Sequence, residues 1–504
     1  MRFIPCSFLF TILLASCSSS RYLGPSPEAE FRGVWIATVV NIDWPKNADD
    51  NVTKQKKDFI DLLEFYQNLN FNAVIVQVRT AGDAFYPTEL APWSKYLTGK
   101  QGRAPADSKD PLKWMIEETH IRDMEFHAWL NPYRATFDLD TLGLDTSHDF
   151  FLHRDWMVRY GKKFYYNPGL PQVRNKFSKV VQELVENYDI DAIHFDDYLY
   201  PYKIKGETFT DSLDFQTYGL PEQSLADWRR SNVDSLVAHV HRTIKKRKPW
   251  VQFGISPFGV WRNKSKDSLG SDTQAGQTTY DDLYANPLLW AEKGWVDYLA
   301  PQAYWSMDYP PASYRNVATW WASQKISTKI YLGNGAYKIK NNADKAWNRK
   351  NEIPEQLQFT RGTPELDGNI FFSAKSLKGQ HEKVVKKIKK WYASPVINPT
   401  LKTSQNRILA PVKINSKTVS RDTLEIKLAH FDSIPRYLLY YSEANKSSGD
   451  KILFKKSYLS AGQENIHDKI AITGRLKRKT IQILVQDIYG NKTHSLVLSR
   501  KQLL

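Results

Sequence analysis

The stretch DIDAIHFDDYLYP, Asp189 to Pro201, contains a short apolar run that ends in two adjacent aspartates, Asp196 and Asp197. Such a run predicts a buried β-strand, with both carboxylates at its carboxyl end. Like charges this close resist joint ionisation, so we expect one of the two pKa values to be raised. Pairs of this kind are more typical of sites that handle protons than of surface decoration.

The same pattern, an apolar run followed by an amphipathic helix, recurs between residues 31 and 394. The apolar runs begin at residues 31, 72, 125, 191, 251, 296, 329 and 368. Helical patterns cover residues 54–69, 111–124, 173–188, 222–247, 282–294, 313–325, 352–361 and 380–392. These units in order predict an α/β fold, the parallel (β/α)₈ TIM barrel. An open doubly wound sheet is the alternative, but no glycine-rich phosphate loop follows the first strand.

Residues 401–504 have a different pattern. After the linker SPVINPT, Ser394 to Thr400, short runs alternate apolar and polar residues and are separated by turn signals. This pattern predicts a small all-β sandwich of the immunoglobulin or fibronectin III kind. The segment carries no catalytic constellation, so its role stays open among packing on the barrel, binding glycan and acting as a spacer.

Residues 1–17 are predicted to be a lipoprotein signal peptide. A basic start precedes a short apolar run, and LASC at residues 14–17 resembles the bacterial lipobox. Cys17 would then carry the lipid, with residues 18–30 as a tether, and several acyl chains would anchor the protein firmly. An ordinary signal with a stray cysteine is the alternative. The apolar run is too short for a transmembrane helix.

This leader predicts a location in the cell envelope, and Ser18 after the modified cysteine favours the outer membrane. The chain has 2 cysteines, Cys6 and Cys17. The first would leave with the signal and the second would carry lipid, so the mature protein is expected to have no disulfide and no thiol nucleophile.

The composition favours a carbohydrate partner and disfavours nucleic acid. The chain contains 16 tryptophans and 27 tyrosines, and an aromatic ring can cover the apolar face of a sugar. The net charge is +16, but the lysine runs fall in helical patterns that suit solvated faces. Nucleic-acid motifs are absent, and a weak attraction to an anionic cell-wall polymer or membrane surface is expected instead.

In a barrel of this kind the site collects at the carboxyl ends of the strands. Polar and aromatic residues occur at these ends and are expected to bind substrate: Asp43, Trp44, Gln77, Arg79, Asn131, Tyr133, Arg134, His194, Tyr198, Gln302, Tyr304 and Trp305. Arg79 and Arg134 could hold a substrate carboxylate or serve in structural ion pairs. Trp35 and Trp129 are further aromatic candidates, although their positions within strands also suit the core.

The motifs of several hydrolase classes are missing. His194 and Asp196 share one face of their strand, but no HExxH motif or second histidine at ligand spacing is present, so we expect no metal and no other cofactor. The serine in GISPFG lacks a nucleophile-elbow setting, which disfavours a serine hydrolase. Glycosidic cleavage by two carboxylates fits the residues better.

Seven blocks in order resemble the glycosyl-hydrolase-like family 10: FRGVWIATVVNIDWP, VQVRTAGDAFYPTELAPWS, HAWLNPYRA, DAIHFDDYLYP, GISPFGVWRN, TYDDLYAN and DYLAPQAYW. The resemblance covers about residues 31–390 and implies an exported (β/α)₈ glycosidase with an immunoglobulin-like C-terminal domain. It also implies a peptide-stripped peptidoglycan glycan as substrate and Asp196 as the central catalytic carboxylate. One departure is that GISPFGVW lacks the glutamate that related barrels use as acid.

Two sources of the missing acid are open. Asp281 or Asp282, in the loop after the fifth strand, could swing over the site, although Asp is also favoured as a helix cap there. Alternatively, Asp196 and Asp197 act together on an N-acetylated sugar, one orienting the acetamido group and the other donating the proton.

The sequence therefore predicts an exported, lipid-anchored glycoside hydrolase acting on a glycan that contains N-acetylhexosamine. The alternative is a non-catalytic glycan-binding lipoprotein of the cell envelope. The expected partners are the polysaccharide and, through the N-terminal lipid, a membrane. The sequence leaves the oligomeric state open.

Overall fold

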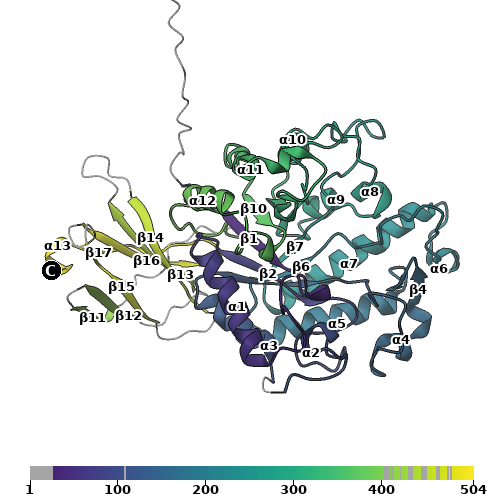
Figure 1. Ribbon diagram of the computed structural model, residues 1–504, viewed down its shortest axis with the longest axis horizontal. Helices are drawn as coiled ribbons and strands as arrows, with labels where there is room; N and C mark the ends of the chain where they lie inside the picture. The colour runs from purple at the N-terminus through teal and green to yellow at the C-terminus, as the bar shows by residue number, and fades with distance from the viewer. Residues whose placement is uncertain are drawn as a thin grey trace, which may run out of the picture.

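The structure is a computed structural model of the 504-residue chain, drawn in Figure 1. It describes residues 26–106, 109–401, 409, 414–420, 422–428, 435–443, 451–460, 466–473, 476 and 479–503. The predicted signal peptide, Cys17 and most of the predicted tether lie outside the described residues.

Residues 31–371 supply eight strands that close into a parallel barrel, which confirms the predicted fold. Around the barrel the order is β1-β10-β9-β8-β7-β6-β3-β2, and β2 pairs with β1 to close it. The strands are β1 (Phe31–Ile36), β2 (Ala73–Arg79), β3 (Glu125–Leu130), β6 (Ala192–Phe195), β7 (Gln252–Ile255), β8 (Tyr298–Leu299), β9 (Lys329–Asn334) and β10 (Gly368–Phe371).

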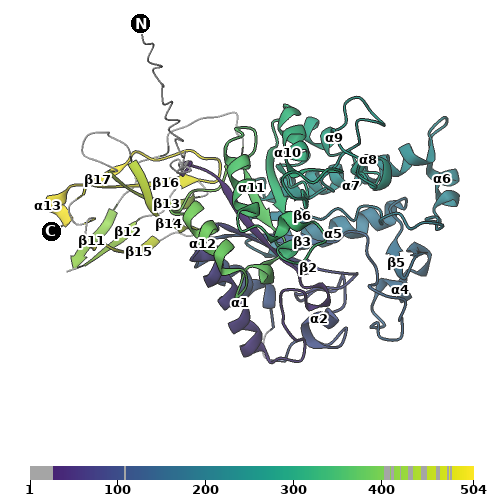
Figure 2. The ribbon, with the colours of Figure 1, turned by 45° about the horizontal axis from the view of Figure 1, so that its top comes forward.

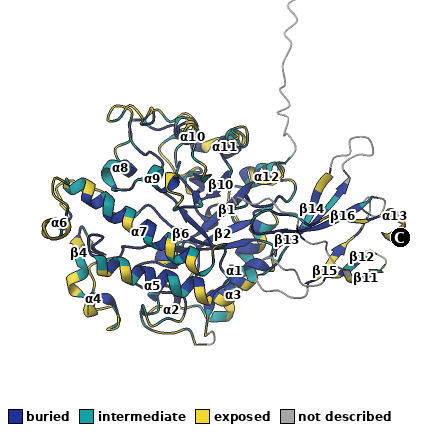
Figure 3. Cartoon of the chain, turned by 180° about the vertical axis from the view of Figure 1, so that it is seen from behind, coloured by how far each residue is buried: buried dark blue, intermediate teal, exposed yellow. Residues whose placement is uncertain are grey.

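Helices surround the barrel, and their inner faces are buried while their outer faces are exposed (Figure 3). The helices are α1 (Val52–Gln67), α2 (Lys95–Thr98), α3 (Pro111–His120), α5 (Pro171–Asn187), α7 (Leu225–Arg247), α8 (Thr279–Asp282), α9 (Pro287–Glu292), α10 (Tyr314–Ser323), α11 (Glu352–Arg361) and α12 (Glu382–Trp391). Several of these helices have a polar N-cap residue. The side chains of Asn51, Asp110 and Ser313 each accept a hydrogen bond from a backbone N–H in the first turn of their helix. Among the described residues, no helix is long and apolar enough to cross a membrane.

Two insertions project from the carboxyl ends of the strands, on the side away from the C-terminal domain (Figure 2). The first follows β3 and contains α4 (Asp149–Leu152) and the antiparallel pair of β4 (Met157–Tyr160) and β5 (Lys163–Tyr166). A bridge between Arg134 and Tyr165 holds this pair to the end of β3. The second follows β6 and contains α6 (Ser212–Tyr218).

The C-terminal domain is a two-sheet sandwich, as the alternating pattern predicts. One sheet has the order β11-β12-β15, with β11 (Ile414–Ser420), β12 (Thr423–Leu428) and β15 (Ile466–Ala471). The other has the order β14-β13-β16-β17, with β13 (Pro435–Glu443), β14 (Lys451–Tyr458), β16 (Ile481–Asp487) and β17 (Leu496–Leu498). The chain ends in α13 (Arg500–Leu503). The three-plus-four arrangement of these described strands is that of fibronectin III domains.

The sandwich docks on the amino-terminal end of the barrel through Arg436. The guanidinium of Arg436 donates to Glu125, the first residue of β3, at 2.8 Å from Nη2, and it also pairs with Asp191, just before β6. All three side chains are buried. Although burial alone would raise them, the pKa values of Asp191 and Glu125 are lowered because of Arg436. The two domains therefore share one buried ion cluster.

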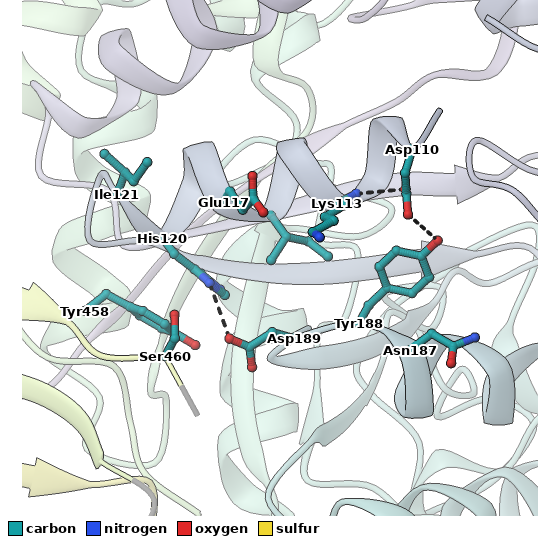
Figure 4. Close-up of a pocket in the computed structure, with 11 residues that line it drawn as sticks. Asp110, Lys113, Glu117, His120, Ile121, Asn187, Tyr188, Asp189, Tyr458 and Ser460 are labelled. Atoms are coloured by element: carbon teal, nitrogen blue, oxygen red, sulfur yellow. Dashed lines mark hydrogen bonds and ion pairs between the residues drawn. The ribbon is translucent and has the colours of Figure 1, made fainter. Parts of the chain in front are cut away.

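A groove of about 810 Å³ lies beside this contact, between α3 and β14 (Figure 4). His120 stacks on Tyr458 at 3.9 Å between ring centroids, and its Nε2 lies 2.9 Å from Asp191. Tyr458 also donates its hydroxyl to Asp191 at 2.6 Å. The groove therefore marks the edge of a close polar interface between the domains.

Inside the barrel, Tyr298 fits only because residue 254 is glycine. The two residues are paired neighbours on β8 and β7, and a Cβ at residue 254 would lie 1.9 Å from Cζ of Tyr298. The absence of a side chain lets the Tyr298 ring cross the barrel, where its hydroxyl lies 2.8 Å from Nδ1 of His127 and 2.9 Å from Nδ1 of His194.

The variant Gly254→Ala is expected to destabilise the protein because the added methyl group overlaps the Tyr298 ring. Overpacking of this kind typically costs about 1–3 kcal/mol, measurable as a lower free energy of unfolding in urea. Gly276→Ala is the matched control, since nothing lies within 4 Å of a Cβ at that exposed position. Equal stability of the two variants would contradict the packing described here.

Candidate active site

Asp196 is held by the neighbouring strand and by its own loop. It follows β6, and β3 pairs beside β6 with Trp129 opposite His194. Asp196 accepts the indole N–H of Trp129 at 3.1 Å, the amide of Asn131 at 3.0 Å to each oxygen, and the backbone N–H of Tyr198 at 3.2 Å. Its side chain is therefore fixed in one orientation at the carboxyl end of the barrel.

The surroundings of Asp196 contain one favourable charge. Burial raises its pKa, and the Arg134 guanidinium opposes that rise most strongly, followed by the hydrogen bonds just described. Arg134 in turn lies over the Tyr198 ring at 4.7 Å from the centroid and donates to the Thr80 carbonyl at 3.3 Å. The net result is a raised pKa for Asp196, and the donors and the nearby cation limit that rise.

Asp197 lies in a less favourable place for a charge. Burial and then the Asp196 carboxylate raise the pKa of Asp197 to about 7. The Tyr202 hydroxyl and the Gln302 side chain donate to it, which partly offsets the rise. The adjacent pair thus combines a carboxyl group held by several donors with one whose pKa is raised to about 7, and both pKa values are raised where the sequence predicted a rise in one.

His194 lies below this pair, inside the barrel. Burial, followed by the nearby His127, lowers the pKa of His194 well below its ordinary value. Its Nε2 lies 3.2 Å from Nε1 of Trp35 and 3.2 Å from Oγ of Ser256. The imidazole is therefore neutral and fully engaged within the core.

Partly exposed aromatic side chains surround the pair, and we refer to them as the aromatic rim: Tyr198, Tyr202, Phe258, Tyr304 and Trp305. Tyr198 and Tyr202 stack at 5.0 Å, and Phe258 meets Trp305 edge to face at 5.5 Å. The rim brings together the sequence-predicted Tyr198, Tyr304 and Trp305, and it adds two residues that the sequence analysis did not select.

The structure places Asp281 and Asp282 in local ion pairs. Asp281 accepts from the Arg262 guanidinium at 3.0 Å. Asp282 accepts the Thr278 backbone N–H at 2.6 Å at the start of α8 and pairs with Lys203 at 2.6 Å. Neither residue is among the charges that perturb Asp196 or Asp197. The N-cap residues here are Thr278 for α8 and Asn286 for α9 (Pro287–Glu292), so neither aspartate is the expected N-cap, and Asp282 instead accepts from the N-cap Thr278.

Two residues selected near β1 serve the scaffold. Trp44 is fully buried, packs against Phe59 at 5.3 Å and presents no ring face to a ligand. Asp43 is buried and accepts the Ser373 hydroxyl at 2.7 Å and the Lys375 backbone N–H at 2.8 Å, so it joins the loops that follow β1 and β10. Asp43 was selected as a polar residue near a strand end and Trp44 for its aromatic ring, and residues of both kinds also close a barrel.

The remaining selected residues are also buried. Gln77 accepts the Thr38 and Val39 backbone N–H groups, at 3.2 and 3.0 Å. Arg79 donates to the Asp83 carbonyl at 3.4 Å rather than contacting Asp196. Tyr133 is 1% exposed. These side chains shape the loops below the aromatic rim.

Two residues that hold the pair were missed or misassigned. Tyr202 follows the strand by several residues, and no spacing rule selects it. Trp129 was considered for its ring, whereas its indole N–H is what contacts Asp196. Among the described residues, no group of three or more His, Cys, Asp or Glu side chains could hold a metal ion.

The chain is similar in sequence to known glycosyl hydrolases. The family described as Glycosyl hydrolase-like 10 matches residues 30–349. The glycosyl hydrolase YngK of Bacillus subtilis (strain 168) is 47% identical over 354 residues, which cover 69% of each chain. The glycosyl hydrolase DigH of Escherichia coli (strain K12) is 38% identical over 364 residues, covering 68% of this chain and 82% of that protein.

Among solved structures, the PgaB (BpsB) glycoside hydrolase domain from Bordetella bronchiseptica is similar with a TM-score of 0.48 and 12% sequence identity. The similarity covers 71% of this chain and 98% of that one.

Proposed function

Because the chain belongs to the glycosyl hydrolase-like 10 family and is a glycoside hydrolase, we propose that Asp196 and Asp197 together carry its catalysis. The observation that supports this assignment is the difference between the two neighbours. Asp196 accepts hydrogen bonds from Trp129, Asn131 and the Tyr198 amide, whereas the pKa of Asp197 is raised to about 7. Paired groups whose environments separate their pKa values suit an acid and an anion.

In the proposed mechanism, Asp197 donates its proton to the glycosidic oxygen as the bond to the anomeric carbon breaks. The acetamido oxygen of the same sugar forms the new bond to that carbon, and Asp196 orients the acetamido N–H and stabilises its developing positive charge. Water then attacks the anomeric carbon and returns its proton to Asp197. This is the substrate-assisted route open to N-acetylated sugars.

The proposed substrate is a glycan that contains N-acetylhexosamine, with peptide-free peptidoglycan strands as the favoured case. The aromatic rim supports a polysaccharide partner, since ring faces cover the apolar faces of sugars. Arg134 supports a muramic acid unit in particular, because its buried Nε has no hydrogen-bond partner and a guanidinium binds carboxylates well. The family resemblance of the sequence blocks points to the same substrate.

We also propose that the mature protein is anchored in the cell envelope by lipid on Cys17, in the outer membrane. The lipobox-like LASC at residues 14–17 and the polar residues after it support this location. A soluble preparation for enzymology can therefore begin near residue 21.

The product assay compares the wild type with Asp196→Asn and Asp197→Asn on amidase-treated and untreated peptidoglycan. The wild type should release short muramyl glycans from the peptide-free strands. Each variant should lower the rate, and loss of a positioned general acid typically costs about 10²- to 10⁴-fold.

Asp282→Asn is the matched control, since it changes a carboxylate that pairs with Lys203 outside the site. It should keep the wild-type rate within about twofold. Loss of activity in Asp282→Asn, or full activity in Asp196→Asn, would contradict the assignment of the pair.

The pH dependence follows from the proton on Asp197. With a pKa of about 7, Asp197 carries the proton below neutral pH and loses it above, so kcat/KM should fall as the pH rises through about 7. The Tyr202 hydroxyl donates to the charged form of Asp197, so Tyr202→Phe should raise this pKa and move the alkaline limb upward by about one pH unit. An alkaline limb that moves to lower pH in Tyr202→Phe would argue against Asp197 as the acid.

The proposed lipid anchor predicts how a substitution of Cys17 changes lipid labelling and membrane association. Cys17→Ser removes the thiol that would receive the lipid, so the protein should lose labelled palmitate and leave the membrane fraction. Full-length protein expressed with its own leader in a Gram-negative host provides the comparison. Cys6→Ser, which changes the other cysteine, should leave both readouts unchanged.

A further inference from the structure

A chain of buried hydrogen bonds passes through His194, which lies on β6 two residues before Asp196. The indole Nε1 of Trp35 lies 3.2 Å from Nε2 of His194, and Nδ1 of His194 lies 2.9 Å from the Tyr298 hydroxyl. Trp35 is 2% exposed, and the other two side chains are fully buried. These contacts cross the barrel from β1 to β6 and then to β8.

The same chain continues to the opposite end of the barrel. The Tyr298 hydroxyl lies 2.8 Å from Nδ1 of His127, whose Nε2 lies 3.0 Å from Oε2 of Glu125. The other carboxylate oxygen of Glu125 accepts from Arg436 at 2.8 Å. Arg436 belongs to β13, so an unbroken path joins the C-terminal domain to the floor of the site.

Both ends of this path can only donate, and this fixes the direction of every bond. The indole N–H of Trp35 makes Nε2 of His194 an acceptor, so the proton of this neutral ring is on Nδ1 and points to the oxygen of Tyr298. Tyr298 then donates to Nδ1 of His127, and His127 donates from Nε2 to Glu125. The guanidinium of Arg436 donates to the same carboxylate, which is consistent with the direction set by Trp35.

The protonation state of the His194 imidazole matters for the proposed reaction. A cationic His194, or one protonated on Nε2, would direct an N–H at the indole N–H of Trp35, so Trp35 would have to move. Trp35 meets Tyr304 of the aromatic rim edge to face at 6.4 Å between ring centroids and Phe372 at 6.3 Å. A positive charge at this place would also favour ionisation of the carboxyl group that must hold a proton.

We propose that Arg436, Glu125, His127 and Tyr298 are positioning residues for hydrolysis, and that the C-terminal domain, through Arg436, keeps His194 neutral and Trp35 in place beneath the catalytic pair. This inference rests on the proposed function of the pair. It gives the C-terminal domain a role in the site that differs from glycan binding and from spacing, because the domain supplies the terminal donor of the chain.

The first test is Tyr298→Phe, which keeps the ring and removes the hydroxyl between the two imidazoles. Loss of one positioned hydrogen bond should lower kcat about tenfold, with KM changed less than about threefold, because no substrate contact is removed. Long-range ¹H–¹⁵N spectra of protein labelled with ¹⁵N-histidine should show the Nδ1–H tautomer of His194 in the wild type. In the variant they should show a mixture of the Nδ1–H and Nε2–H tautomers.

The second test is made at the interface between the domains. Arg436→Met should lower kcat as Tyr298→Phe does and shift the ring nitrogens of His127 and His194, whereas Arg436→Lys should restore part of both by keeping a cation beside Glu125. Lys492→Met is the matched control, since it removes another cation of the C-terminal domain, one that pairs with Glu28 outside the hydrogen-bond chain. It should change neither kcat nor the spectra.

Circular dichroism and thermal unfolding of each variant establish that it is folded. Unchanged kcat and histidine spectra in Tyr298→Phe would overturn the proposal, and so would an effect of Lys492→Met as large as that of Arg436→Met. The spectra report on the chain without substrate. A wild type that releases no product therefore counts against the proposed function, and an Nε2–H form of His194 in the wild type counts against this inference.

Discussion

Two carboxylates buried at the amino-terminal end of the barrel, Glu125 and Asp191, determine how the whole chain is assembled. A buried carboxylate without a partner is strongly unfavourable, and the described part of the barrel meets this demand with His120, His127 and backbone donors. Arg436, from the other domain, forms an ion pair with each of the two carboxylates. The sandwich is therefore joined to the barrel by an electrostatic requirement of the barrel itself.

Burial of carboxyl groups is also unfavourable at the carboxyl end of the barrel, where the neighbouring Asp196 and Asp197 have different hydrogen-bond partners and pKa values. Asp196 receives donors from the strand beside it and a cation nearby, whereas Asp197 receives fewer donors and a like charge. Burial acts on both residues in the same direction, so the difference comes from the number and kind of their partners. One strand end thus presents, within a single dipeptide, a carboxyl group held by three donor groups and a carboxyl group whose pKa is raised to about 7.

The sequence was sufficient for the eight barrel strands and the sandwich, because each strand is a short apolar or alternating run bounded by turn residues. It also located Asp196 and Asp197, since a strand end is visible in one dimension. Pairwise contacts between distant segments were not visible: Lys203 with Asp282, Tyr202 with Asp197 and Asp43 with Ser373 depend on how loops fold over one another. Trp44 was selected for its residue type, and only its packing identifies it as core.

The place where the chain enters the barrel limits how far the barrel could lie from a membrane under the proposed lipid anchor. Glu30 bonds to Ile397 and is held by Arg361 at the amino-terminal end, so residues 26–30 leave from the face opposite the aspartates. With lipid on Cys17, the nine peptide steps to Ser26 reach at most about 30 Å. Under the proposed anchor, the amino-terminal end of the barrel therefore lies within about this distance of the lipidated residue, and the aspartates lie at the opposite end of the barrel. The number of residues between the proposed lipid and the barrel would thus set which depth of the surrounding polymer the site can reach.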